Sequence, residues 1–360
     1  MRAWLREGYG LDALALREVP DPPLDPEGVL VRVRATSVNA AEWYGADGGP
    51  LVIRTASGLR APRTPGFGVD FSGVVESVGK AFDGDLAPGD EVVGGRDGAY
   101  AELVSVKNGV VRKPPSVSFE EAGGVAIAGT TALQALRDHA GVRSGMKVLV
   151  NGASGGVGTF TLQIAKAMGA EVTAVCSTGK VEQARELGAD RVVDYTREDF
   201  TRSGERYDAV VDVGGGRSFR ELRRVLADDA PVVVVGLGNV KGGLVGPIGP
   251  LVRIKAGGLI ARRRCIFFVA KITRADMQEL ADLMADGRVE LGRTEEVEET
   301  HEVGADWAIV VPAGIWHNLV NTGEEPLKLY SLYAPPEHPD GTVHRTKAEA
   351  EAAEAQEHGR

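Results

Sequence analysis

An apolar run, Val148 to Val150, leads directly into a glycine-rich turn, Asn151 to Gly158, and then into helical spacing from Thr159 to Met168. Gly155 permits a tight turn and a close approach to the backbone, and Gly158 permits close packing of the helix on the strand. N–H groups at the start of a helix have no partner within it and attract phosphate. The segment therefore predicts a turn that binds a dinucleotide.

The strands and the helix around this turn indicate dinucleotide binding more specifically than its glycines do. Read from Ala153, the pattern is A-x-G-x-x-G, and a second strand, Glu171 to Val175, completes the strand–helix–strand unit. A purely structural strand-to-helix turn is the alternative. We assign coenzyme contacts to the residues of the turn and helix start, namely Gly152, Ala153, Ser154, Gly155, Gly156 and Val157.

Composition restricts the partners of the chain. With 360 residues, 43% hydrophobic and 26% charged, it is long enough for two or three domains. Its net charge of -10 argues against nucleic acid or an anionic membrane as a main partner, and we interpret Arg262–Arg264 as a solvated face. Only Cys176 and Cys265 are present, which excludes a disulfide framework and a four-cysteine zinc site and fits a cytoplasmic protein. No segment reaches the roughly 18 apolar residues that span a bilayer.

The chain changes character near residue 118. Residues 1–118 are rich in Gly and Pro, with β-branched runs at Val29–Val33 and Phe71–Val78 that are typical of a small barrel-like all-β domain. Beyond them, helices and strands alternate, which implies a parallel sheet with helices on both faces. We expect helices at Ala128–Ala140 and Asp276–Asp286. The expected strands are Lys147–Val150, Glu171–Val175, Asp190–Asp194, Asp208–Asp212 and Pro231–Val235.

The C-terminal part differs again. After a return segment, 266–290, residues 291–345 contain β-rich runs at Trp307–Val311 and Leu327–Tyr333 between Pro and Gly turns. Residues 346–360 are rich in Ala and Glu without an apolar stripe, so we expect an exposed, frayed helix or disorder.

Several short phrases accompany the glycine turn, and together they are specific. They are Ser37–Asn39, Pro65–Val75, Pro88–Val92, Thr131–Gln134 and the strand phrase Tyr207–Asp212. With them, residues 1 to about 290 resemble the medium-chain dehydrogenase/reductase superfamily, and within it the zinc-free quinone oxidoreductase branch. The resemblance implies an α/β fold with a GroES-like β-barrel domain (1–118) and a doubly wound Rossmann domain (119–265). It also implies hydride transfer to a quinone or an α,β-unsaturated carbonyl, catalysed by orientation and electrostatics, and a homodimer.

Zinc-using members of that superfamily place a cysteine after the first strands and a His-Glu pair in the later glycine segment. Here Ala40 and Phe67–Gly68 stand at those places, so we expect no zinc and no metal-assisted polarisation of a carbonyl. Asp70 is the one carboxylate of that segment, and we interpret it as a turn or backbone-binding residue.

The end of the second strand bears on the choice of coenzyme. NAD-selective sites usually carry Asp or Glu there, whereas this chain has Ser177, Thr178 and Lys180. Hydroxyls and a lysine without a carboxylate suit a 2′-phosphate, and Tyr195 matches a family position beside that phosphate. We therefore expect NADPH rather than NADH. An ordinary polar loop with a capping Ser or Thr is the alternative.

By resemblance, Asn39 and Tyr44 line the substrate side of the cleft and Thr131 contacts the nicotinamide, each offering a hydrogen bond to an oxygen that gains charge. Tyr44 is also a candidate proton relay, a role that solvent could fill. The alternatives are a turn-bridging Asn39, a surface Tyr44 and an ordinary helical Thr131. Further coenzyme contacts are expected where later strands end, at Val213, Gly214, Gly236 and Leu237.

The tail departs from the reductase pattern. Pro312–Asn321 resembles the second motif of cupins, P-x-G-x-x-H-x-x-x-N, and the similarity extends to Thr342. A cupin metal site also needs an earlier His-x-His and Glu motif, which is missing, so His317 predicts no bound metal even with His301 or His338 as helpers. Because a partial jelly roll leaves strand edges unpaired, we expect the tail strands to pair with the front barrel, with each other or with a second subunit.

The leading interpretation is a zinc-independent, NADPH-dependent oxidoreductase that acts on a small molecule, with a partial cupin-like segment at its end. One rival is an NADPH-binding protein without turnover, because the usual reductase ending is missing. The other rival makes the tail the active part, as a cupin that binds a metal or a sugar.

Overall fold

The computed structural model describes residues 1–47, 54, 58, 61–236, 257 and 264–291. Met1–Gly292 forms one compact unit and Arg293–Arg360 a second. Several predictions lie outside the described residues: Leu237, the strands at 307–311 and 327–333, the cupin-like motif around His317, and the charged tail. Within the described residues, no helix has both the length and the apolar character that crossing a bilayer requires.

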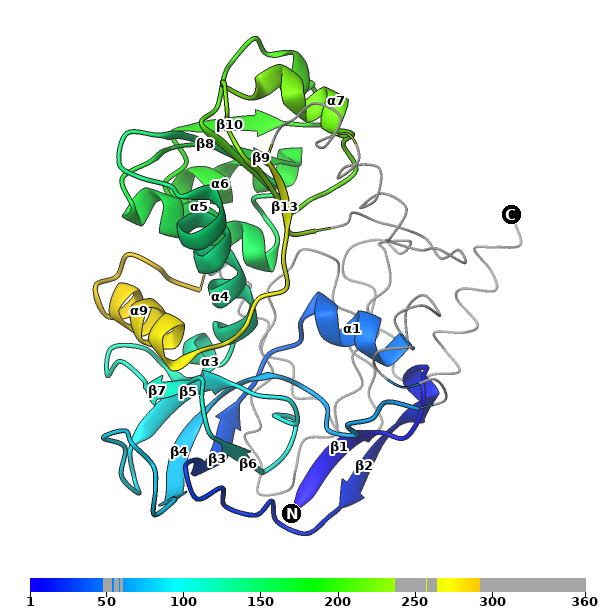
Figure 1. Ribbon diagram of the computed structural model, residues 1–360, viewed down its shortest axis with the longest axis vertical. Helices are drawn as coiled ribbons and strands as arrows, with labels where there is room; N and C mark the ends of the chain where they lie inside the picture. Colours follow the sequence, from blue (N-terminus) through cyan, green and yellow to red (C-terminus); the bar gives the residue numbers. More distant parts are fainter. Residues whose placement is uncertain (48–53, 55–57, 59–60, 237–256, 258–263, 292–360) are drawn as a thin grey trace. The chain divides into compact units, whose positions relative to one another are not determined.

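The N-terminal part of the first unit is built from antiparallel strands, as its β-branched runs predict (Figure 1). A hairpin, β1 with β2, accompanies a five-stranded sheet of order β6-β3-β4-β5-β7. Its interior is apolar and includes Val31, Phe71 and Val92, all fully buried. The strands are β1 (Arg2–Arg6), β2 (Leu14–Glu18), β3 (Val29–Ala35), β4 (Asp70–Val78), β5 (Glu91–Gly95), β6 (Leu103–Val106) and β7 (Val110–Arg112). The helical segments are η1 (Leu11–Ala13), α1 (Ala40–Asp47) and α3 (Phe119–Ala122).

The second part holds a six-stranded sheet of order β10-β9-β8-β11-β12-β13, in which every neighbouring pair is parallel. In chain order this is 3-2-1-4-5-6, the arrangement of a Rossmann sheet, so the predicted doubly wound domain is confirmed. The strands are β8 (Lys147–Asn151), β9 (Glu171–Cys176), β10 (Arg191–Asp194), β11 (Ala209–Asp212), β12 (Val232–Val234) and β13 (Cys265–Phe267).

The last strand, β13, is absent from the sequence prediction. It has three residues directly after a basic triplet, which is too short for a periodic signal. The sheet itself reveals it, because β13 pairs with β12 from Cys265 to Phe267.

Both faces of this sheet are covered, because alternate strand residues point to opposite sides. Val148 and Val150 pack in one apolar cluster with Phe160 and Leu280, whereas Leu149 packs in the other. The helical segments are α4 (Ala126–Gln134), η2 (Ala135–Ala140), α5 (Gly156–Ala167), η3 (Thr178–Lys180), α6 (Val181–Glu186), η4 (Phe200–Arg202), α7 (Phe219–Leu222), η5 (Arg223–Val225) and α9 (Arg274–Ala285). Figure 1 shows α4 and α9 close together, in keeping with their contacts.

Two buried polar side chains hold the C-terminal end of the described chain to the sheet domain. Asp276 of α9 accepts hydrogen bonds from Gln134 at 2.9 Å and Arg137 at 2.6 Å. Gln163 of α5 clamps the backbone of Glu290, donating to its carbonyl at 2.9 Å and accepting from its N–H at 2.8 Å. The return segment is therefore bound to both α4 and α5.

Candidate functional site

The predicted glycine turn lies where strand order reverses, between β8 and β11, which is where coenzymes bind in open α/β sheets. Gly152 follows β8 with a φ of +83°, a conformation that L side chains rarely adopt. A Cβ at Gly152 would lie 2.5 Å from Gly214 N. The tight turn is therefore made at Gly152, directly after β8. The sequence analysis had placed it three residues later, at Gly155.

Gly158 and Gly155 play different parts. A Cβ at Gly158 would lie 2.0 Å from Gly152 O, so this glycine allows the helix to contact the turn, as expected. A Cβ at Gly155 would meet no protein atom nearer than 3.9 Å, and Gly155 has an ordinary φ of −83°. The protein itself does not require glycine at 155, so the open space above it suits a bound group.

Helix α5 begins at Gly156, three residues earlier than its apolar spacing predicts. Thr159 N donates to Gly155 O at 2.9 Å, so the N–H groups of Gly156, Val157 and Gly158 precede the first such bond of the helix. Gly155 and Gly156 are exposed. Amides at a helix start, beside two exposed glycines, fit a pyrophosphate.

A buried pair of polar side chains shapes the neighbouring loop. Asn151 ends β8 and Asp212 ends β11, and Asn151 Nδ2 donates to Asp212 Oδ1 at 2.7 Å. The same oxygen accepts from Gly215 N at 2.9 Å, while Val213 N and Gly214 N donate to Asn151 O. Asp212 is fully buried, burial raises its pKa, and its Oδ2 has no partner among the described residues.

The later strand ends meet this loop. A Cβ at Gly236 would lie 1.7 Å from Val213 O, and Gly236 N donates to Asp212 O at 3.1 Å. The fold thus brings Gly152, Val213, Gly214 and Gly236 together, four residues that the sequence proposed separately. The Asn151–Asp212 pair was missed, although each is a polar residue that ends an apolar strand.

The ends of β9 and β10 bring together the residues proposed for the 2′-phosphate. Ser177 directly precedes η3 and Lys180 is its last residue, and Tyr195 N donates to Cys176 O at 3.1 Å. The Tyr195 residue is 54% exposed, so its ring is available to a ligand.

A carboxylate that the sequence analysis overlooked lies beside them. Asp194 accepts from Thr178 Oγ1 at 2.6 Å and from Thr196 Oγ1 at 2.7 Å, and Arg197 Nε lies 3.4 Å away. The hydrogen bond from Thr178 is the main cause that lowers the pKa of Asp194. Since three partners already bind this carboxylate, it ties the β9 and β10 turns together.

On the substrate side, the structure joins Asn39 to the helix that carries Thr131. Asn39 Nδ2 donates to Asp70 Oδ2 at 3.1 Å and to Ser37 Oγ at 3.2 Å, and Asp70 Oδ1 accepts from Ile127 N at 2.7 Å. The side-chain amide of Asn39 is thereby held within the protein. Thr131 lies half-exposed on α4, and Tyr44 lies on α1, although its side chain is outside the description.

Asp70 is fully buried at the start of β4. It binds a backbone amide, as expected, but it begins a strand and makes no turn. Burial raises its pKa to about 6 in spite of the hydrogen bond from Ser37.

The described residues contain no group of three or more His, Cys, Asp and Glu side chains placed to hold a metal ion.

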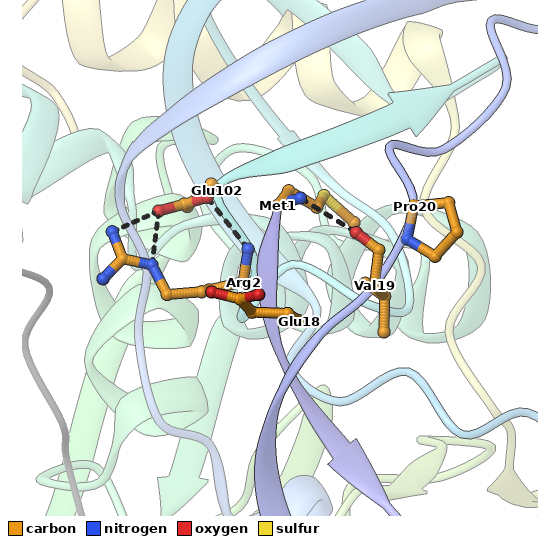
Figure 2. Close-up of a pocket in the computed structure, with 6 residues that line it drawn as sticks. All are labelled: Met1, Arg2, Glu18, Val19, Pro20 and Glu102. Carbon is orange, nitrogen blue, oxygen red and sulfur yellow. Dashed lines mark hydrogen bonds and ion pairs between the residues drawn. The ribbon is translucent and has the colours of Figure 1, made fainter.

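A separate hollow lies near the N-terminus (Figure 2), lined by Met1, Arg2, Glu18, Val19, Pro20 and Glu102. Three of its charged groups, the Met1 ammonium, Arg2 and Glu102, are paired within the protein. Arg2 Nε and Nη2 donate to Glu102 Oε1 at 2.9 and 2.7 Å, and the Met1 ammonium donates to Val19 O at 2.8 Å. The glycine turn contributes no residue to this hollow.

Comparisons with known proteins agree with this geometry. Residues 25–116 match the alcohol dehydrogenase GroES-like domain, residues 156–286 the zinc-binding dehydrogenase family, and residues 284–333 the cupin domain. A chloroplastic quinone oxidoreductase of Triphysaria versicolor is 30% identical over 307 residues, which cover 80% of this chain and 88% of that protein. A 2-methylene-furan-3-one reductase of Solanum lycopersicum is 34% identical over 257 residues, or 65% of this chain and 62% of that protein.

Among solved structures, the quinone oxidoreductase of Coxiella burnetii aligns with a TM-score of 0.68 and 26% identity, covering 80% of this chain and 88% of that one. The alignments therefore extend over both the barrel and the Rossmann domain. With the Rossmann strand order and the glycine turn at its switch point, they show that the chain belongs to the quinone-oxidoreductase-like branch of the medium-chain dehydrogenase/reductase superfamily of nicotinamide-dependent oxidoreductases.

Proposed function

We propose that the chain is a zinc-independent, NADPH-dependent reductase of quinones or α,β-unsaturated carbonyls. The observation that carries this proposal is the open space above Gly155, beside the first amides of α5 and at the switch point of the sheet. A nicotinamide coenzyme supplies a hydride when it is bound. Two relatives are named a quinone oxidoreductase and a 2-methylene-furan-3-one reductase, which supports a quinone or an α,β-unsaturated carbonyl as the acceptor.

The contribution of the protein is orientation and electrostatics. The start of α5 and the Val213–Gly214 loop would hold the coenzyme, and Thr131 on α4 would contact its nicotinamide. Asn39 is held by Asp70 and Ser37, so it contributes a side chain with a fixed position. The proton that completes the reduction would come from solvent or from Tyr44.

Zinc independence rests on the donor set. Ala40, Phe67 and Gly68 bring no metal ligand, and both carboxylate oxygens of Asp70 are engaged by Ser37, Asn39 and Ile127. A zinc site would require these hydrogen bonds to be broken and two or three more ligands to be supplied.

Two measurements test the function. Isothermal calorimetry should show NADPH binding more tightly than NADH, and NADPH oxidation should follow the addition of a quinone or an enone from a panel of acceptors. Binding without oxidation by any acceptor would favour the rival of a coenzyme-binding protein without turnover. No heat with either coenzyme would refute the proposal.

Lys180 tests the coenzyme preference. Replacing Lys180 by Met removes a cation from the proposed 2′-phosphate site, so the Kd for NADPH should rise about tenfold while that for NADH stays unchanged. Lys80→Met, at an exposed lysine of the barrel domain, is the matched control. An equal loss for both coenzymes in Lys180→Met would place Lys180 elsewhere than at the 2′-phosphate.

The remaining parts of the proposal concern assembly and location. We propose a homodimer in the cytoplasm with a small-molecule substrate and without nucleic acid or membrane partners. Light scattering of the purified chain tests the dimer, and a monomer at micromolar concentration would contradict it.

The match of residues 284–333 to the cupin domain keeps a second candidate function in view. Metal analysis of the purified full chain distinguishes it. A stoichiometric metal would favour binding by the cupin-like segment, whereas a metal-free protein that oxidises NADPH would favour the reductase alone.

A further inference from the structure

Two buried acids meet beside Asn39. Glu42, on α1, is 5% exposed, and Asp70, on β4, is fully buried. Asp70 accepts from three donors: Ser37 Oγ at 2.8 Å, Asn39 Nδ2 at 3.1 Å and Ile127 N at 2.7 Å. Every one of these bonds is satisfied by an ionised carboxylate, which only accepts.

Glu42 is surrounded differently. Its Oε1 accepts from Val69 N at 3.0 Å, and its Oε2 accepts from the Asn39 N–H at the start of α1. Oε2 also lies 3.1 Å from Tyr100 Oη. Tyr100 Oη in turn lies 2.7 Å from the carbonyl oxygen of Ser37.

Counting protons decides how these contacts work. A phenol carries one hydrogen, and the Ser37 carbonyl can only accept, so the 2.7 Å contact uses the hydrogen of Tyr100. The contact between Tyr100 Oη and Glu42 Oε2 then needs a hydrogen from Glu42. The alternative, an ionised Glu42, would have to share the single phenol hydrogen with the Ser37 carbonyl, which weakens one of the two contacts in a buried site.

We propose that Glu42 is held as a neutral carboxylic acid that donates to Tyr100, and that this Glu42–Tyr100 pair positions the Ser37–Asn39 segment at the substrate side of the site. Glu42 and Tyr100 are thus positioning residues that act through Asn39. The assignment of the proton stands on the geometry alone. The effect on catalysis rests on the proposed function.

Burial and the neighbouring carboxylate of Asp70 favour the neutral form of Glu42, and the hydrogen bond from the Asn39 N–H opposes them. Asp70 lies across the cluster on β4, and Tyr100 precedes β6. The guanidinium of Arg6, on β1, lies 5.5 Å from the centroid of the Phe67 ring. It donates to the carbonyls of Thr64 and Gly66. Burial, and then the charge of Asp70, raise the pKa of Glu42 from 4.5 to about 7. Burial likewise raises the pKa of Tyr100, so the phenol stays protonated.

The sign of the pH dependence follows. Because the folded protein holds the Glu42 proton more tightly than the unfolded chain does, the stabilisation is complete below about pH 4.5 and is lost as the pH rises towards 7. The raised pKa of Asp70 acts in the same direction at lower pH.

Infrared spectroscopy tests the proton directly, because a protonated carboxyl group has a carbonyl band that carboxylates lack. Because the pKa of Asp70 is about 6, the band is measured near pH 7, where Asp70 is largely ionised. The wild type and the Glu186→Gln control, at an exposed glutamate, should show equal bands there, and the band of Glu42→Gln should be weaker by the contribution of Glu42. Glu42→Gln should also flatten the fall of Tm between about pH 5 and pH 8. The assignment would be overturned if the band of Glu42→Gln equalled that of the wild type. It would also be overturned if the Tm of Glu42→Gln fell with pH as steeply as that of the wild type.

Tyr100→Phe tests the positioning role. Amide hydrogen exchange in a peptide that covers Ser37–Asn39 should become about tenfold faster, while Glu186→Gln, at an exposed glutamate, should leave it unchanged. With an accepted substrate, kcat/KM should fall about tenfold and the Kd for NADPH should stay within about twofold. Unchanged exchange in Tyr100→Phe would overturn the positioning role, whether or not any acceptor is reduced.

Discussion

Gly155→Asp is expected to abolish coenzyme binding without harming the fold. The backbone of Gly155 is extended, with φ −83° and ψ 170°, and a Cβ there meets no protein atom closer than 3.9 Å. Aspartate is also a favourable residue at this position, just before a helix, because its carboxylate accepts from the first amides. The same carboxylate would occupy the amides proposed for the pyrophosphate and would repel its charge. The Kd for NADPH should rise by at least about a hundredfold, as measured by calorimetry.

Gly155→Asn is the matched control for charge. Asparagine has nearly the same shape and caps helices equally well, so both variants should melt within a few degrees of the wild type. Asparagine should weaken NADPH binding by about tenfold, because it fills the space and occupies the same amides but does not repel the phosphates. Wild-type affinity in Gly155→Asp would show that the phosphates do not approach this turn.

Gly158→Ala is expected to have the opposite profile, a large loss of stability. The added methyl group would lie 2.0 Å from Gly152 O and 2.9 Å from two atoms of Ala153, so the backbone of the turn must move away from α5. Rigid backbone cannot relax as a side chain does, and we expect about 3 kcal/mol of lost unfolding free energy in urea denaturation.

Gly179→Ala provides the control for this variant. No atom lies within 4 Å of a Cβ at Gly179, so the same chemical change should alter stability by less than about 0.5 kcal/mol. A Gly158→Ala protein as stable as the wild type would mean that α5 can shift on the sheet. We therefore expect Gly155 to be required for coenzyme binding and Gly158 to be required for stability of the fold.

Local pattern was sufficient to predict the sheet domain. Strands such as Lys147–Asn151 and Glu171–Cys176 were predicted within one residue, because short apolar runs between turn residues carry their own signal. The start of α5 was misplaced, because a helix that opens with Gly156, Val157 and Gly158 lacks apolar periodicity in its first turn. Strand β13 was missed for the same kind of reason, since three residues are too few to show alternation.

The coenzyme side of the site was also accessible from the sequence, but its details were not. Glycine-rich turns and strand ends indicated Gly152, Val213, Gly214 and Gly236 without showing that they touch one another. Asp194 was overlooked because its relation to Thr178 depends on the pairing of β9 with β10, which spacing along the chain does not reveal.

What the amino-acid sequence determined by itself was the type of domain and the place of the dinucleotide turn, because strand periodicity and glycine conformation are properties of neighbouring residues. The tertiary structure alone decided the acid cluster, because Asn39, Glu42, Asp70 and Tyr100 are brought together from α1, β4 and the segment before β6. Hydrogen bonds between residues 31 and 58 positions apart leave no trace in local pattern. The protonation of Glu42 follows only from which oxygen atoms the fold places within reach of one another.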